Sequence, residues 1–109
     1  MQPYTQQQSM DDLIMFVERN GWKAVLIEAD SVAFVKPGFA IMASAEWAED
    51  GSEIVLRAVN PFDQGMIHGC LQTPLYFEEE DVAGYLVAME KRDRDRAVKG
   101  RVERARAGR

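Results

Sequence analysis

His68 and Cys70 are the residues whose types and spacing most directly suggest chemistry, because each is the only one of its kind and a single residue separates them. In a strand this spacing places both side chains on one face, where an imidazole can activate a thiol. A working pair also needs an orienting group and oxyanion donors, and the sequence reveals neither. A single cysteine is more commonly a small buried hydrophobic residue. We therefore expect no catalytic residue and interpret the protein as a non-enzymatic one.

Metal and nucleotide sites are not indicated either. One histidine and one cysteine cannot supply the four nitrogen or sulfur ligands of a zinc site. The acidic segments do not follow the fixed aspartate spacing and final glutamate of a calcium loop. The glycines within residues 63–69 lack the spacing of a phosphate-binding loop. We expect neither a metal nor a cofactor.

Charge is divided unevenly along the chain. Residues 1–90 carry 15 acidic and 4 basic side chains, a net charge of −11, whereas residues 91–109 carry 9 basic and 3 acidic ones, a net charge of +6. An acidic body therefore precedes a basic C-terminal segment. Such asymmetry bears on binding partners and solubility, and it does not specify a fold.

The acidic body suggests a protein that binds a basic surface on another protein. Carboxylates in this density can imitate the charge of a nucleic acid, since duplex DNA carries one negative charge per roughly 1.7 Å of axis. Compact acidic inhibitors, including anti-CRISPR proteins of phages, use this physics, and the analogy is one of size and charge only. The predicted binding residues are Glu46, Glu49, Asp50, Glu53, Glu78, Glu79, Glu80 and Asp81.

The basic C-terminal segment supports an alternative hypothesis, an accessory protein that binds RNA or DNA. Its arginines could neutralise phosphates and release counterions, with the globular part acting as a spacer or as the contact of a homodimer. Asp93, Asp95 and Glu103 lie among them and lower the effective charge. The candidate residues are Arg92, Arg94, Arg96, Lys99, Arg101, Arg104 and Arg106.

Residues 22–60 predict the core of the fold, a four-stranded antiparallel meander. Four apolar runs are separated by turn-forming residues at 29–31, 36–38 and 49–52. The first run, residues 22–28, is continuously apolar, so we expect a central strand that is covered on both faces. Residues 39–47 are also compatible with a helix by propensity, but the Pro-Gly and Asp-Gly boundaries favour a strand. Residues 62–77 are apolar but interrupted by glycine and proline, so they form either a long ordered loop or a loop that holds a short fifth strand near residues 66–71.

Two helices complete the predicted α+β domain. Apolar residues recur at helical spacing over residues 10–19 and again after residue 78, where four acidic residues suit the start of a helix. Ser9, followed by Asp12 three residues later, resembles a capping box at the start of the first helix. Both helices should pack on one face of the sheet, burying Leu13, Phe16, Val17, Leu86 and Met89 against Ile41, Ile54 and Leu56. We expect a disordered arm over residues 1–9, a single domain over 10–96 and a flexible basic tail over 97–109.

Cysteine use and hydrophobicity suggest a cytoplasmic protein. A single cysteine cannot form an internal disulfide, and the N-terminus lacks the basic-then-apolar pattern of a signal peptide. The longest uncharged run, residues 64–77, contains Gln, Gly, His and Pro, so it is too short and too polar to cross a bilayer. We therefore expect no membrane partner.

Overall fold

The structure, a computed structural model, describes residues 5–59 and 67–107, and the side chains of residues 5–58 and 70–95 within them. Five strands form one antiparallel sheet in the order β1-β2-β3-β4-β5, with a helix before them and a helix after them. The predicted α+β meander is therefore confirmed, including its fifth strand. The elements are α1 Gln6–Arg19, β1 Lys23–Ile27, β2 Ser31–Val35, β3 Met42–Trp47, β4 Glu53–Val59, β5 Ile67–Pro74 and α2 Glu79–Ala107.

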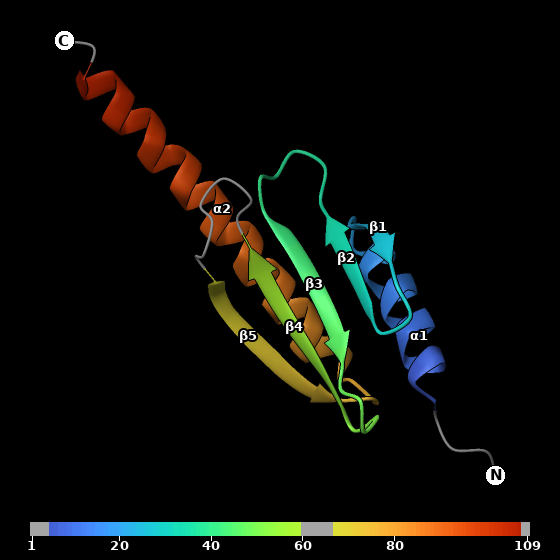
Figure 1. The fold of residues 1–109 in the computed structure, drawn as a ribbon. Coiled ribbons are helices and arrows are strands. Elements are labelled where there is room, and N and C mark those ends of the chain that lie inside the picture. Colours follow the sequence, from blue (N-terminus) through green and yellow to red (C-terminus); the bar gives the residue numbers. More distant parts are fainter. Residues whose placement is uncertain (1–4, 60–66, 108–109) are drawn as a thin grey trace.

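Both helices cover the same face of the sheet and leave its other face, the open face, uncovered by any described element (Figure 1). The hydrophobic core lies between the helices and the covered face. Every residue of the predicted core set is buried, from Leu13 in α1 to Met89 in α2. Trp22, Val32, Phe34, Ala43, Ala45, Trp47, Ala58 and Val82 complete most of the rest of this core.

Strand β3 resolves the ambiguity between helix and strand in favour of the strand. Ala43, Ala45 and Trp47 are buried, while the residues between them lie on the open face, as strand alternation requires. The β2–β3 connection turns at Gly38, whose φ of 88° and the hydrogen bond from Phe39 N to Lys36 O (3.1 Å) match the expected Pro-Gly turn.

Strand β1 corrects the prediction that the first strand is central. It is an edge strand with β2 as its only neighbour in the described sheet, and most of its residues are exposed. The continuous apolar run from Ala24 to Ile27 suggested burial on both faces, but the run contains a β-bulge between Ala24 and Leu26. A bulge inserts an extra residue and breaks the alternation, so a continuous apolar run did not mean a doubly covered strand.

Helix α1 begins earlier than expected. Thr5 is the N-cap: its Oγ1 accepts a hydrogen bond from Gln8 N (3.1 Å), and its own N donates to Gln8 Oε1 (2.8 Å). The sequence predicts Ser9 as the cap of this helix and residues 1–9 as a disordered arm, but Ser9 is instead a fully buried residue within the helix. Residues 1–4 lie outside the described residues.

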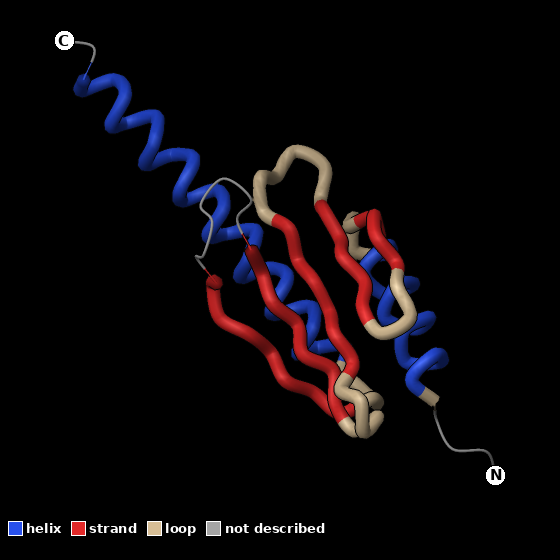
Figure 2. The backbone as a smooth tube through the Cα atoms, viewed as in Figure 1, coloured by secondary structure: helices blue, strands red, loops and turns tan. Residues whose placement is uncertain are grey.

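Helix α2 extends past the sheet (Figure 2). Its first turns pack on the sheet through Val82, Leu86 and Met89, and its backbone stays helical to Ala107. The segment expected to be a flexible tail, residues 97–109, therefore continues this helix as far as Ala107. Within the described ranges, no helix has the length and apolar character needed to cross a membrane.

Candidate protein-binding surface

The two acidic groups predicted from the sequence meet at one end of the molecule. One end of the sheet holds the end of β3, the start of β4, the end of β5 and the start of α2, as an antiparallel meander requires and as Figure 1 shows. Glu53 pairs with Pro74 across the β4–β5 ladder, so the β3–β4 turn lies beside the segment that leads into α2. The side chains of all eight predicted acidic residues are exposed.

Two further carboxylates, which were not predicted from the sequence, lie at this end. Glu28 and Asp30 flank the β1–β2 turn, and the hydrogen bond from Trp47 N to Asp30 O (2.9 Å) holds that turn beside the end of β3. Because strands alternate in direction, the first and third turns of a meander must lie at the same end of the sheet. This rule could have identified Glu28 and Asp30 from the sequence. We call the acidic end the set Glu28, Asp30, Glu46, Glu49, Asp50, Glu53, Glu78, Glu79, Glu80 and Asp81.

The β3–β4 turn is held in shape by one of its own carboxylates. Asp50 Oδ1 accepts hydrogen bonds from Ser52 Oγ (2.7 Å) and from Ser52 N (3.0 Å). These bonds, the side-chain one first, favour the ionised form and lower the pKa of Asp50 below its usual value. Gly51 has a φ of 73°, a conformation that suits glycine. The turn therefore presents charge on a defined backbone.

The position of the carboxylates at the start of α2 also has a local physical cause. Glu78 O accepts the backbone N–H groups of Asp81 (3.1 Å) and Val82 (3.2 Å), which starts the helix. Glu79, Glu80 and Asp81 occupy its first turn, where the positive end of the helix dipole stabilises negative charge. This second acidic group is thus placed by helix chemistry and not by contact with the first.

An open hollow of about 390 Å³ lies beside the acidic end, between α1 and the segment that joins β5 to α2. Tyr76 and Met15 are large and exposed, with 67% and 62% of their surface accessible. Arg19 reaches across to Glu79 with a separation of 3.7 Å between charged atoms. The hollow is lined by Asp12, Met15, Arg19, Tyr76, Phe77 and Glu79.

A buried hydroxyl holds the wall of this hollow. Ser9 Oγ donates a hydrogen bond to Leu75 O (3.0 Å) and accepts one from Trp47 Nε1 (3.1 Å). It therefore joins α1, the end of β3 and the segment before Tyr76 at one point. The rings of Phe16 and Phe77 pack nearby with centroids 6.0 Å apart. Tyr76 is the residue after Leu75, whose carbonyl the hydrogen bond from Ser9 holds in place. The packing around Ser9 therefore fixes the backbone from which the exposed Tyr76 side chain extends.

The first residues of the basic C-terminal segment lie at the opposite end, where the β2–β3 connection packs against α2. Arg94 lies over the ring of Phe39, with its guanidinium carbon 5.6 Å from the ring centroid. Lys36 forms an ion pair with Glu90, and Asp93 accepts a hydrogen bond from Ala40 N (3.3 Å). Arg92 is exposed, and the side chains of Arg96, Lys99, Arg101, Arg104 and Arg106 lie outside the described ones.

Both residues of the chemical pair considered first lie on β5. Cys70 is exposed on β5 opposite Arg57, and the side chain of His68 lies outside the described ones. No group of three or more potential metal ligands occurs among the described residues. Burial raises the pKa of Tyr85 to about 12, with a smaller contribution from Cys70 and an opposing one from Arg92. Tyr85 therefore stays neutral at physiological pH.

Comparisons with protein-family models, with curated proteins and with solved structures find no match to this chain. The chemistry of its own surface is thus the basis for the function proposed next.

Proposed function

We propose that this protein is a non-enzymatic binding protein whose acidic end docks on a basic surface of another protein. The observation that carries the proposal is the convergence of three acidic segments at one end of the sheet. The cations Lys23 and Lys36 lie at the opposite end, where Lys36 pairs with Glu90, and Arg19 pairs with Glu79 beside the acidic end. The concentration of carboxylates at one end steers the approach of a basic partner and orients it.

The hollow supports the same proposal because it adds an apolar anchor to the charged surface. Charged rims contribute mainly to association rate and specificity, whereas binding energy concentrates in a few large side chains. Exposed tyrosine and methionine are among the residues enriched in interfaces. Tyr76 and Met15 lie in the hollow, and Glu79 at its rim belongs to the acidic end. A basic partner would thus meet carboxylates and an aromatic side chain together.

We further propose that the surface bound is one that normally holds nucleic acid, so that the protein acts as an inhibitor by competition. This step rests on charge alone. The test is capture of partners on the immobilised chain from a nuclease-treated extract of the organism that encodes it. Increasing amounts of a duplex DNA should release the captured protein if both ligands share its surface, and an uncharged polymer should not. Release by neither would contradict competition while leaving protein binding intact.

A second candidate function, nucleic-acid binding through the basic C-terminal segment, is favoured by one observation. Beyond Asp95, the backbone of helix α2 continues past the sheet to Ala107, where a partner could approach it (Figure 2). Under this hypothesis, deletion of residues 97–109 removes a gel shift with RNA or DNA. Under the proposal above, the same deletion leaves protein capture unchanged.

A further inference from the structure

Strand β1 exposes three consecutive large apolar side chains at the edge of the sheet. Val25, Leu26 and Ile27 have 53%, 57% and 59% of their surface accessible. In the described sheet β1 pairs only with β2, so its other edge offers unpaired backbone groups. An edge strand with an apolar sequence is a template for a further strand, and proteins usually protect such edges.

The β1–β2 register places each β1 side chain on a definite face. Lys23 pairs with Val35 and Leu26 pairs with Ala33, so both share the open face with these half-buried residues. Ala24 and Ile27 pair with the buried residues Phe34 and Val32 and share the covered face.

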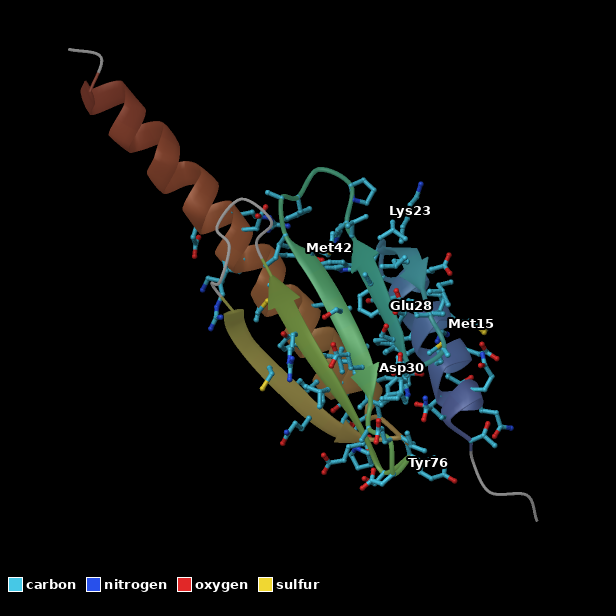
Figure 3. The ribbon with its side chains drawn as sticks, in the orientation of Figure 1. Met15, Lys23, Glu28, Asp30, Met42 and Tyr76 are labelled. Carbon is cyan, nitrogen blue, oxygen red and sulfur yellow. The ribbon has the colours of Figure 1, made fainter. Side chains whose placement is uncertain are left out.

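Glu28 belongs to the open face as well. Its N–H donates to Ser31 O (2.8 Å), so it lies directly opposite Ser31 at the hairpin end. Ser31 in turn precedes Val32 on β2 and therefore faces the open side. The bulge at Val25 makes this possible, because in a regular strand two residues five positions apart, such as Lys23 and Glu28, face opposite sides. A cation at the start of β1 and an anion just after its end thus share one face of the sheet. Figure 3 labels both residues.

We propose that this edge is the contact surface for a second copy of the chain, which pairs β1 with β1 antiparallel around a two-fold axis perpendicular to the sheet. Full overlap of the two strands places Leu26 opposite Leu26 of the partner copy at the axis. It also places Lys23 opposite Glu28 of the partner copy, twice. A shift by two paired positions in either direction would set a charged residue opposite Leu26 instead. The charge pattern therefore selects the fully overlapped register.

Helix α1 would contribute to the same contact. A two-fold axis perpendicular to the sheet keeps the covered faces of both copies on one side, so the two α1 helices approach each other across the joint. The dimer would be a continuous sheet with its two acidic ends pointing in opposite directions, able to bind two partners.

Sedimentation equilibrium of the whole chain tests this inference. Because the strand is short, we expect a weak dimer, with a dissociation constant on the order of 10 μM. Lys23→Glu alone and Glu28→Lys alone each place like charges opposite each other twice. Each should raise the dissociation constant at least about tenfold. Mixing these two variants in equal amounts should restore dimers, because both charged pairs across the joint then consist of one carboxylate and one ammonium group.

A matched pair of apolar substitutions completes the test. Leu26→Lys places two lysines at the axis and should abolish dimerisation, while Val87→Lys, at a valine 61% exposed on α2, should not. Circular dichroism confirms that each variant folds. A wild-type chain that stays monomeric to about 500 μM would overturn the inference, since the bulge and Lys23 would then serve to keep the edge unpaired. Dimers that tolerate Leu26→Lys, or variants that fail to dimerise on mixing, would overturn it too.

Discussion

Removal of the Ser9 hydroxyl should destabilise the protein far more than a serine-to-alanine change usually does. The hydroxyl serves two groups at once, the carbonyl of Leu75 and the indole N–H of Trp47. Ser9 itself is fully buried, and the Trp47 residue is only 4% exposed. Ser9→Ala therefore leaves one deeply buried donor and one partly buried acceptor without their partner.

The magnitude follows from these two losses. A buried polar group left without a partner costs about 1 to 3 kcal/mol, and the partly buried carbonyl of Leu75 belongs at the low end of that range. Alanine returns roughly 0.5 kcal/mol through its higher helix propensity. We expect Ser9→Ala to lower the free energy of unfolding by about 1.5 to 3.5 kcal/mol, a large part of the stability of a small domain.

Urea unfolding followed by far-ultraviolet circular dichroism measures this loss. Ser31→Ala is the matched control, because its hydroxyl lies 3.4 Å from Glu28 Oε2 at an exposed site, and it should change stability by less than about 0.5 kcal/mol. Equal, small effects of the two substitutions would refute the assignment of Ser9 as the joint between α1, β3 and the wall of the hollow.

Two other side chains give contrasting predictions. Trp22 is buried and its indole N–H has no partner among the described groups, whereas the indole N–H of Trp47 donates a hydrogen bond to Ser9. Trp22→Phe should therefore cost about 1 to 2 kcal/mol less in unfolding free energy than Trp47→Phe. Equal costs of the two substitutions would contradict this prediction. Burial raises the pKa of Tyr85 to about 12 from 10.0, so the stability from its neutral phenol is fully present below pH 10 and is lost as pH rises toward 12. Tyr85→Phe should remove this part of the alkaline loss and the tyrosinate absorbance step near pH 12, and an unchanged alkaline profile would count against it.

Most of the fold could be predicted from the sequence because strand alternation was clear where one face is buried. Ala43, Ala45 and Trp47 alternate with residues of the open face, and Ile54 and Leu56 do so on the next strand. Strand β1 was misplaced because its apolar run resembles that of a buried strand. Only the register with β2 reveals the bulge and the exposed edge.

The candidate surface was predicted in part. The charged residues were evident, but their convergence depends on the alternating strand directions, and Glu28 and Asp30 follow only from that topology. Ser9 resembled a helix cap because polar residues are common there, while its partner Leu75 is 66 positions away in the chain. The length of α2 was hidden by Gly100 and by the charged residues that interrupt its apolar stripe after Met89.

The central claim is that the acidic end is the binding element, and association kinetics of matched charge variants test it most directly. Glu49→Lys with Glu53→Lys changes the acidic end and spares Asp50, which holds the turn. Glu18→Lys with Asp95→Lys changes the net charge equally at exposed sites elsewhere. The captured partner should bind the first variant at least about tenfold more weakly, mainly through a slower association rate that depends steeply on salt. The second variant should stay within about threefold of the wild type, and equal effects of the two pairs would contradict the account.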